Sequence, residues 1–311
     1  MSTERARPVE DFEAHRSYLR GLAYRMLGSQ AEAEDAVQEA WLRWREVDRG
    51  DVTQPRAFLA QTVTRLCLDR LKSAQAQREI YVGPWLPEPL VNDDELFEPG
   101  PEAAAEFASD LSYAFMLALE RLSPLERAAF LLHDVFDADF GEVAVALDRS
   151  EPACRQLAAR ARTHLREARP RFRISATEHE RLATAFLHAA RSGDADSLKQ
   201  LLAEDARLIA DGGGRVPSAG VPLLGRDRVI KFLVGISRKH PAPIGTRVEI
   251  ATINGLPGFA IFAADGKPIQ TNAIEPTAEG RIAAIYIVRN PDKLRHLATH
   301  AQRGVPLHGT R

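Results

Sequence analysis

The stretch DRSEPACRQLAARARTHLREARPRFR, residues 148–173, decides the fold of the middle of this chain. The apolar segment before it, Gly141–Leu147, predicts a short helix, and Asp148–Arg149 predicts a tight turn. Ser150 is a good N-cap residue, and Pro152 suits the first turn of the next helix. Two helices joined by a tight turn, the second one basic, indicate a helix-turn-helix.

The helix after the turn is strongly basic. From Arg155 to Arg173 the sequence holds seven arginines and one glutamate. A helix-turn-helix lays its second helix in the major groove with the N-terminal residues on base edges. We therefore expect Arg155 and Gln156 to face bases, and Arg160 and Arg162 to lie nearer phosphates, where they add salt-dependent affinity. The alternative is a solvated arginine-rich helix without a ligand.

Length and composition indicate a globular protein of two or three domains. A chain of 311 residues with 45% hydrophobic residues, 27% charged residues and a net charge of −2 is ordinary for this class. Cys67 and Cys154 lie far apart without metal-like spacing, which predicts buried thiols in a reducing cytoplasm. The sequence has no apolar run long enough to span a bilayer and no secretory leader near Met1. We expect a cytoplasmic protein without a metal or cofactor.

The chain divides into four consecutive parts. Apolar residues at helical spacing fill the first and third parts. After about residue 177, amphipathic helices give way to β-like runs separated by turn signals, which is an α+β pattern with antiparallel strands. The predicted parts are an all-α helical domain at 8–80, a linker at 81–106, a second all-α domain with the helix-turn-helix at 107–173, and an α+β domain at 177–300.

The linker sequence YVGPWLPEPLVNDDELFEPGPEAAAE, residues 81–106, is unusual for a spacer. It holds five prolines, seven acidic residues from Glu88 onward, and no lysine or arginine. Trp85 and Leu86 are nevertheless too apolar for a purely solvated tether. A segment that another domain grips would explain them, and a disordered acidic spacer is the alternative.

Two surfaces of the first helical part carry patterned charge. On the helix expected at 31–47, one face holds an exposed leucine among acids, which predicts docking against a basic helix of a partner; an ordinary charged surface is the alternative. That face is Asp35, Gln38, Glu39 and Leu42. The helix that Pro55 opens is basic instead, and it follows a loop at 48–54. Cations beside a loop suit unpaired DNA, and a solvated basic helix is again the alternative. The cations are Arg56, Arg65, Arg70 and Lys72.

Three segments together resemble the bacterial extracytoplasmic-function (ECF) sigma factors. They are GSQAEAEDAVQEAWLRW (28–44), PRAFLAQTVTRLCLDRLKSA (55–74) and LSPLERAAFLLHDVFDADFGEVAVALDRSEPACRQLAARARTHLREAR (122–169). The resemblance covers about residues 10–173. It implies two helical domains that direct RNA polymerase to promoters, with the β′ clamp and the β flap of the core polymerase and promoter DNA as partners.

The resemblance also implies roles for residues. The face of Asp35, Gln38, Glu39 and Leu42 would dock on the clamp coiled coil of β′. The −10 element would be read and opened by the 48–54 loop with Arg56, Arg65, Asp69, Arg70 and Lys72. The −35 element would be read by Ser150, Arg155, Gln156, Arg160 and Arg162. Many family members have Asn in place of Arg65 and Arg in place of Lys72, which leaves the −10 preference open.

The last part resembles a SnoaL-like domain, a cone-shaped α+β fold whose curved sheet encloses a pocket. The resemblance rests on HERLATAFLHAARSGDADSLKQLLAEDARLIADGGGR (179–215) and the later strands. An ECF subgroup that includes the sigma factor J type carries such a domain, with three short signatures. Here they are Trp85, Leu86, Pro87, Glu88 and Pro89 in the linker; Asp211, Gly212, Gly213, Gly214 and Arg215; and Asn290, Pro291, Asp292, Lys293 and Leu294.

These resemblances imply an ECF-type sigma factor controlled in cis by a domain that grips the linker and the first domain. They also allow a small-molecule ligand in the C-terminal pocket. One alternative is a SnoaL-type isomerase or cyclase tethered to a DNA-binding helical half; another is a regulator that binds duplex DNA without polymerase. As catalytic residues, Asp211, His188, His240 and His296 are candidates by residue type only. Asp211 is better explained by its turn with the glycines, so we expect no enzyme.

Overall fold

The computed structural model describes residues 12–47, 52–79, 81–91, 112–166, 176–240 and 243–302. The chain divides into two units. One joins Met1–Glu79 with Asp93–Arg169, and the other joins Ile80–Asn92 with Pro170–Arg311. Residues 48–51 of the predicted DNA-reading loop and residues 92–106 of the predicted linker lie outside the described residues.

The first unit is all-α, and local signals set its helix ends. Gly28 ends the first helix with a φ of 72°, and Ser29 caps the next by accepting the backbone N–H of Glu32. Pro55 opens the third helix, as predicted. The helices are α2 (Arg16–Leu27), α3 (Gln30–Glu46), α4 (Pro55–Glu79), α6 (Tyr113–Leu119), α7 (Pro124–Phe130), the π-helical turn η3 (Leu131–Val135), α8 (Phe140–Leu147) and α9 (Glu151–Leu165).

The predicted helix-turn-helix is formed by α8 and α9. Asp139 and Glu142 make a reciprocal capping box at the start of α8, and Asp148 ends this helix in the left-handed conformation with a φ of 53°. Ser150 occupies the N-cap position of α9 with Pro152 in the first turn, but the Ser150 side chain makes no capping hydrogen bond. The buried face of α9 packs on α7 and α8 and consists mostly of small side chains: Cys154, Ala158, Ala161 and Leu165.

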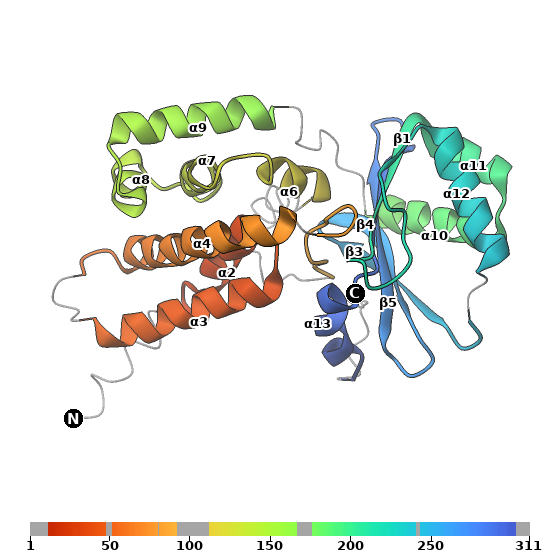
Figure 1. Ribbon diagram of the computed structural model, residues 1–311, viewed down its shortest axis with the longest axis horizontal. Coiled ribbons are helices and arrows are strands. Elements are labelled where there is room, and N and C mark those ends of the chain that lie inside the picture. The colour runs from red at the N-terminus through yellow and green to blue at the C-terminus, as the bar shows by residue number, and fades with distance from the viewer. Residues whose placement is uncertain are drawn as a thin grey trace. The chain divides into compact units, whose positions relative to one another are not determined.

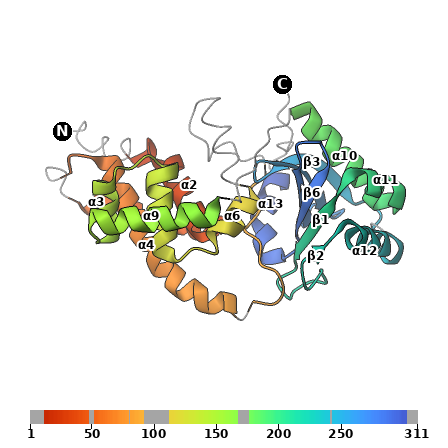
Figure 2. The ribbon, with the colours of Figure 1, turned by 90° about the horizontal axis from the view of Figure 1, so that it is seen from above.

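The core of the first unit lies between the apolar faces of α2, α3 and α4. Leu19, Leu22, Met26, Trp44 and Val63 are almost fully buried there. Helix α4 also contacts α7 and α8, so it lies between α3 and the layer formed by α7, α8 and α9 (Figure 1). Figure 2 shows α9 running along one face of this unit.

The two cysteines are buried and unbonded, as the sequence indicated. Burial raises the pKa of the Cys67 thiol to about 12, so this side chain packs as a small apolar group. No group of three or more metal-ligating side chains gathers among the residues that the structure describes. Within the same residues, no helix has the length and apolar character that a membrane span requires.

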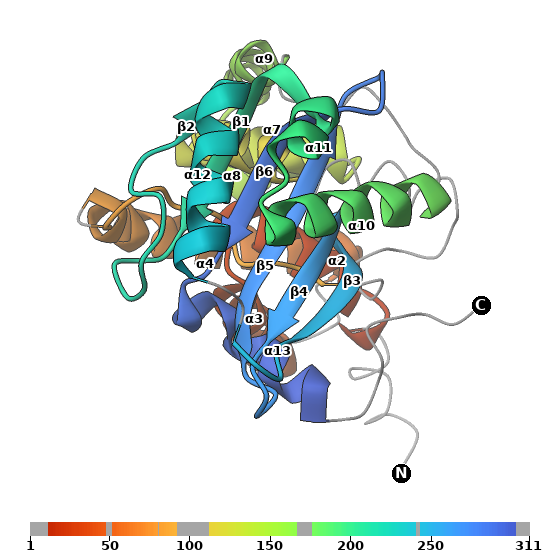
Figure 3. The same ribbon diagram turned by 90° about the vertical axis from the view of Figure 1, so that its right-hand side faces the viewer.

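The second unit is a sheet with helices on both faces. The strand order is β2-β1-β6-β5-β4-β3; β1 and β6 pair in parallel, and the other neighbours are antiparallel. Helices α10, α11 and α12 lie over one face (Figure 3), and α13 lies on the other (Figure 1). The elements are α10 (Ala176–Ser192), α11 (Ala195–Leu201), β1 (Leu202–Asp211), β2 (Leu223–Leu224), α12 (Arg226–Lys239), β3 (Arg247–Ile253), β4 (Leu256–Phe262), β5 (Pro268–Pro276), β6 (Ile282–Val288) and α13 (Pro291–Gln302).

The core of this unit lies between the sheet and α10–α12. Phe186 of α10 packs against Phe259 of β4 with 6.3 Å between ring centroids, and Leu208, Val229 and Ile285 belong to the same buried cluster. One detail differs from the sequence expectation. The sheet contains one parallel pair, β1 with β6, among the expected antiparallel strands.

Candidate functional site

The segment Tyr81–Val91, called the linker segment below, packs on the second unit. Leu86, Leu90 and Val91 are at most 6% exposed. Val91 forms an antiparallel bridge with Ile253 of β3, which places the end of the segment beside the edge of the sheet. Of the two residues that are too apolar for a purely solvated tether, Leu86 is buried and Trp85 is partly buried.

The parallel pairing of β1 with β6 brings two of the predicted signatures together. Asp211 ends β1 opposite Val288 of β6. The backbone carbonyl of Asp211 accepts the N–H groups of Arg289 and Asn290 at 2.7 and 3.0 Å. Asn290 and Pro291 then start α13, which carries Lys293 back over the end of β1. The DGGGR and NPDKL sequences thus form one structure.

The side chain of Asp211 is fully buried and is surrounded by donors. It accepts the Tyr81 hydroxyl at 2.6 Å, the backbone N–H of Leu86 at 2.9 Å and the backbone N–H of Gly213 at 3.0 Å. Lys293 Nζ lies 2.7 Å from Asp211 Oδ2. A carboxylate with this many charge-assisted hydrogen bonds is a structural anchor, because no oxygen is left to take a proton from a substrate.

Lys293 is the second centre of this cluster and is 8% exposed. Its ammonium group donates to the carbonyl of Leu86 at 2.5 Å as well as to Asp211. It also lies over the Trp85 ring at 4.4 Å and the Tyr81 ring at 4.9 Å from the ring centroids, which are cation–π distances. We call Tyr81, Asp211, Asn290 and Lys293 the linker clamp.

Asn290 and Tyr81 complete the linker clamp. The Asn290 amide donates to the Tyr81 hydroxyl at 2.9 Å, and that hydroxyl donates to Asp211. Burial, and then the hydrogen bond to Asp211, raise the pKa of Tyr81 above its usual value. The phenol is therefore protonated at neutral pH and remains a donor. Tyr81 lies outside the WLPEP signature, so sequence reasoning missed it.

A second contact holds the linker segment at Leu90. The backbone of Asn254 donates to the Leu90 carbonyl at 2.8 Å, and the Asn254 side chain accepts the Leu90 N–H at 3.0 Å. Asn254 and Gly255 have φ values of 50° and 71°, as in a tight hairpin turn between β3 and β4. His296 Nε2 lies 2.9 Å from the Pro89 carbonyl. The Asn-Gly pair marks the turn in the sequence, but nothing in it indicates a contact with the linker.

The glycines of the DGGGR signature make room for close approach. Gly213 and Gly214 have φ values of 59° and 68°, and a Cβ at Gly213 would lie 2.3 Å from Asn290 Nδ2. A Cβ at Gly212 would lie 2.4 Å from the Val216 carbonyl. Arg215 is exposed and pairs with Asp292 at 3.5 Å, within the signatures themselves. Among the remaining signature residues, Leu294 is in the core, Pro87 is buried, and Glu88 is partly exposed.

The face of α3 predicted to dock on polymerase is presented to solvent. Asp35, Gln38 and Leu42 are exposed, and the Leu42 side chain is 50% exposed. Glu39 is partly buried because it pairs with Arg43 of the same helix at 2.7 Å and with Arg70 of α4 at 3.5 Å. The four residues share one face, with an apolar side chain beside carboxylates.

The predicted −10 residues of α4 differ in their surroundings. Arg70 donates to the Glu32 carbonyl at 2.6 Å and braces α4 against α3, while Lys72 pairs with Asp69 at 2.8 Å on the surface. Arg65 is exposed, but it donates to the Val145 carbonyl at 2.9 Å, at the end of α8. In this structure the guanidinium of Arg65 therefore binds the helix-turn-helix.

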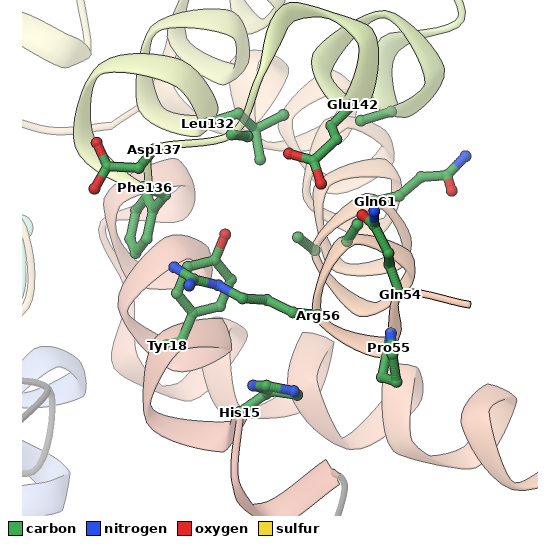
Figure 4. A pocket seen from close by; sticks show the side chains of 14 residues that line it. His15, Tyr18, Gln54, Pro55, Arg56, Gln61, Leu132, Phe136, Asp137 and Glu142 are labelled. Carbon is green, nitrogen blue, oxygen red and sulfur yellow. The ribbon is translucent and has the colours of Figure 1, made fainter. Parts of the chain in front are cut away.

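Arg56, the remaining cation of this set, lies over the Tyr18 ring, 4.2 Å from its centroid. Both residues line a pocket of about 340 Å³ in the first unit (Figure 4). The other lining residues come from both predicted helical domains. Gln54 and Gln61 belong to the domain predicted at 8–80, and the domain predicted at 107–173 contributes Phe136, Asp137 and Glu142.

The predicted −35 residues lie along α9. Ser150, Arg155, Gln156 and Arg160 are exposed. Arg155 pairs with Glu151 at 2.8 Å and lies over the Phe140 ring at 4.6 Å. Arg162 instead makes two hydrogen bonds with Asp134, at 2.6 and 3.1 Å, and so ties α9 to the end of η3. Arg169 and Arg173 lie outside the described residues.

The histidines named as catalytic candidates by residue type do not form a site. His188 and His240 are exposed, and His296 contacts the linker segment.

Comparisons with known proteins cover most of the chain. The Sigma-70 region 2 model matches residues 12–77, and the Sigma-70 region 4 model matches residues 112–165. The ECF RNA polymerase sigma factor SigJ of Mycobacterium tuberculosis is 37% identical over 308 residues, which are 96% of each chain. The crystal structure of the M. tuberculosis sigma factor SigJ is similar with a TM-score of 0.71 and 35% identity, covering 92% of this chain and 98% of that one. A putative SnoaL-like isomerase from Agrobacterium tumefaciens matches 36% of this chain and 97% of its own, with 18% identity and a TM-score of 0.27.

Proposed function

We propose, from the premise that the chain belongs to the extracytoplasmic-function (ECF) RNA polymerase sigma factors, that its C-terminal domain controls the sigma factor in cis by holding the linker segment. The sequence prediction of an ECF sigma factor is confirmed, and RNA polymerase and promoter DNA are its partners. Sigma factors are initiation factors and not enzymes, so the alternative of a DNA-tethered isomerase or cyclase is not favoured. A regulator that works without polymerase is not favoured either.

The observation that carries the proposal is the buried linker clamp. The linker segment lies between the stretches that match sigma-70 region 2 and region 4. A domain that holds this segment limits the separations and orientations that the two regions can reach. Release of the segment would remove this limit, and the regions could then span the distance between two promoter elements on polymerase.

The clamp has the physical character of a reversible latch. Its contacts to Leu86 go to the backbone N–H and carbonyl, and Asn254 holds the backbone of Leu90 in the same way. The Tyr81 and Trp85 rings of the linker segment lie over the ammonium group of Lys293, so release of the segment would expose the ion pair to water. Because the segment is tethered, it binds at an effective concentration of roughly millimolar, so a weak contact can hold it. Polymerase that binds the linker in its own channel would compete with the clamp.

The experiment is promoter-dependent transcription with purified core RNA polymerase. It compares the full-length chain, the full-length variant Trp85→Ala and a chain that ends at residue 175. If the clamp restrains the linker, the variant and the shortened chain both produce more transcript than the full-length protein. Equal transcription by all three would contradict cis control and leave the sigma factor assignment intact.

The docking residues are proposed on the same premise. The α3 face of Asp35, Gln38, Glu39 and Leu42 would bind the β′ clamp coiled coil, where Leu42 supplies the apolar contact and the acids meet basic side chains. Region 4 would bind the β flap. These roles follow from the exposure of the face and from the family of the chain.

The DNA-reading residues are proposed in two sets. On α4, Arg56, Arg65, Asp69, Arg70 and Lys72 would act at the −10 element, with Arg65 becoming available only after it leaves the α8 carbonyls. On α9, Ser150, Arg155, Gln156, Arg160 and Arg162 would act at the −35 element. We further propose a cytoplasmic location, where polymerase and promoters are found, and a small-molecule ligand in the C-terminal domain as a second way to change the clamp.

A further inference from the structure

The linker segment is recognised through its backbone at two leucines. At Leu86 the N–H donates to Asp211 at 2.9 Å and the carbonyl accepts from Lys293 at 2.5 Å. At Leu90 the N–H donates to the Asn254 side chain at 3.0 Å and the carbonyl accepts from the Asn254 backbone at 2.8 Å. Such paired contacts satisfy both polar groups of a residue, as strand addition does in peptide-binding domains.

The prolines between these leucines suit the same purpose. Pro87 and Pro89 are buried, and a proline has no backbone N–H that burial would leave without a partner. Their restricted φ also keeps the unbound segment extended, which lowers the entropy lost on binding. The Pro89 carbonyl has a partner in His296. Glu88 lies between the prolines and is partly exposed, so burial does not restrict which residue type can stand at this position.

Side chains add specificity at the two ends. Leu86 is 0% exposed and Leu90 is 3% exposed, so both side chains are buried anchors. Trp85 lies over the ammonium group of Lys293. Aromatic rings and buried apolar anchors of this kind dominate the affinity of peptide interfaces. The pattern recognised over residues 85–90 is therefore an aromatic residue followed by Leu-Pro-x-Pro-Leu, where x is any residue.

We propose that this surface of the C-terminal domain is a peptide-recognition site, and that it takes an extended segment of another polypeptide with the pattern aromatic-Leu-Pro-x-Pro-Leu in place of the linker segment. The inference rests on the proposed clamp and names the chemistry of a partner that would open it. A partner segment must compete with a tethered one, so it binds only when its affinity is high or the linker segment has been weakened.

The test uses the full-length chain and a blocked, fluorescent peptide of residues 81–91, YVGPWLPEPLV. The variant Leu86→Asp carries a charge that the buried site does not accept, so its own linker segment leaves the surface. Fluorescence anisotropy should show that the peptide binds this variant about tenfold or more tightly than it binds the wild-type chain. Adding Lys293→Ala to the variant should abolish binding. A peptide with alanine at both proline positions should bind about tenfold more weakly.

Circular dichroism first establishes that the Leu86→Asp chain is folded, and Trp85→Ala serves as a second weakened linker if it is not. The proposal is overturned if the peptide fails to bind folded chains of either variant, or if a scrambled peptide binds equally well. Neither polymerase nor DNA is present, so the outcome is independent of cis control. Peptide binding without any transcriptional effect would refute the proposed function alone.

Discussion

Asp211 and Lys293 lie 82 residues apart in the sequence, and their side chains form a buried ion pair with 2.7 Å between Oδ2 and Nζ. Both groups also bind the backbone of Leu86. The bound linker segment therefore shields the ion pair from water, and the pair satisfies the backbone groups of Leu86. Replacing both partners of a buried ion pair by apolar groups changes the folding stability little. Removing only one partner is costly, because it leaves the other charge buried and unpaired.

Lys293→Met should therefore destabilise the second unit by about 3–5 kcal/mol. Urea unfolding followed by tryptophan fluorescence measures the change. Arg215→Gln provides the matched control, because its ion pair with Asp292 is exposed and such pairs contribute about 0–1 kcal/mol. The double variant Asp211→Asn with Lys293→Met should recover part of the loss. Equal effects of Lys293→Met and Arg215→Gln would show that the pair is not a structural anchor.

Trp85→Ala should raise promoter-dependent transcription several-fold while both units stay folded. The ring covers the Lys293 ammonium group, and its loss weakens the clamp by about 0.5–2 kcal/mol, the range of cation–π contacts. Transcript yield with purified core polymerase is the measurement. Lys267→Gln, in the exposed turn between β4 and β5, is the control and should leave the yield unchanged. Lower transcription by Trp85→Ala would mean that the clamp assists initiation.

Leu42→Ala should weaken binding to core polymerase about tenfold, as expected for an apolar contact at the centre of an interface. Leu42 is half-exposed, so its removal should scarcely change folding stability. Surface-immobilised core polymerase gives the dissociation constant. Ile236→Ala is the matched control, since Ile236 is also a partly exposed aliphatic residue but lies on α12. Similar affinities for the two variants would remove the case for an α3 docking face.

Gln156→Ala and Arg160→Ala should have different effects on promoter binding. Loss of a phosphate contact at Arg160 should weaken binding to all sequences and reduce the slope of log K against log[salt] by about 0.9. Loss of a base contact at Gln156 should instead relax the preference at one −35 position by about 1–3 kcal/mol. Fluorescence titrations of polymerase holoenzyme on promoter variants at several salt concentrations separate the two. If both variants changed the salt dependence and the base preference in the same way, the proposed orientation of α9 would be wrong.

The capping box of α7 should make stability depend on pH. Burial raises the pKa of Glu126, but hydrogen bonds from the Ser123 hydroxyl and backbone outweigh it and lower the pKa below its usual value. A depressed carboxyl pKa stabilises the fold above the unfolded pKa, and this contribution disappears as pH falls through the folded pKa. Ser123→Ala should cost about 1 kcal/mol at pH 7 and less at acidic pH.

Urea unfolding at pH 7 and at acidic pH measures the loss of stability. The control is Ser123→Thr, which keeps the hydroxyl. A loss that is the same at acidic and neutral pH would exclude a charged Glu126 as its origin.

Much of the helical half follows from local sequence. Gly28, Ser29 and Pro55 mark helix ends because a cap depends on backbone groups within about four residues of it. The turn at Asp148 and the start of α9 at Glu151 follow from the same kind of signal, and so does the helix-turn-helix. The exposed face of Leu42 could be read from helical spacing alone, since the period of a helix assigns each residue to a side.

What the sequence by itself determined was which segments carry chemistry: the basic helix, the acidic face, and the three signatures. Only the tertiary structure decided which of them meet. The parallel register of β1 and β6 places Asp211 beside Asn290 and Lys293, and the Asn254 turn reaches Leu90. Tertiary packing also decides that Arg65 donates to a carbonyl of α8. Local signals carry no information on these contacts, because strand register and packing depend on apolar burial over the whole sheet.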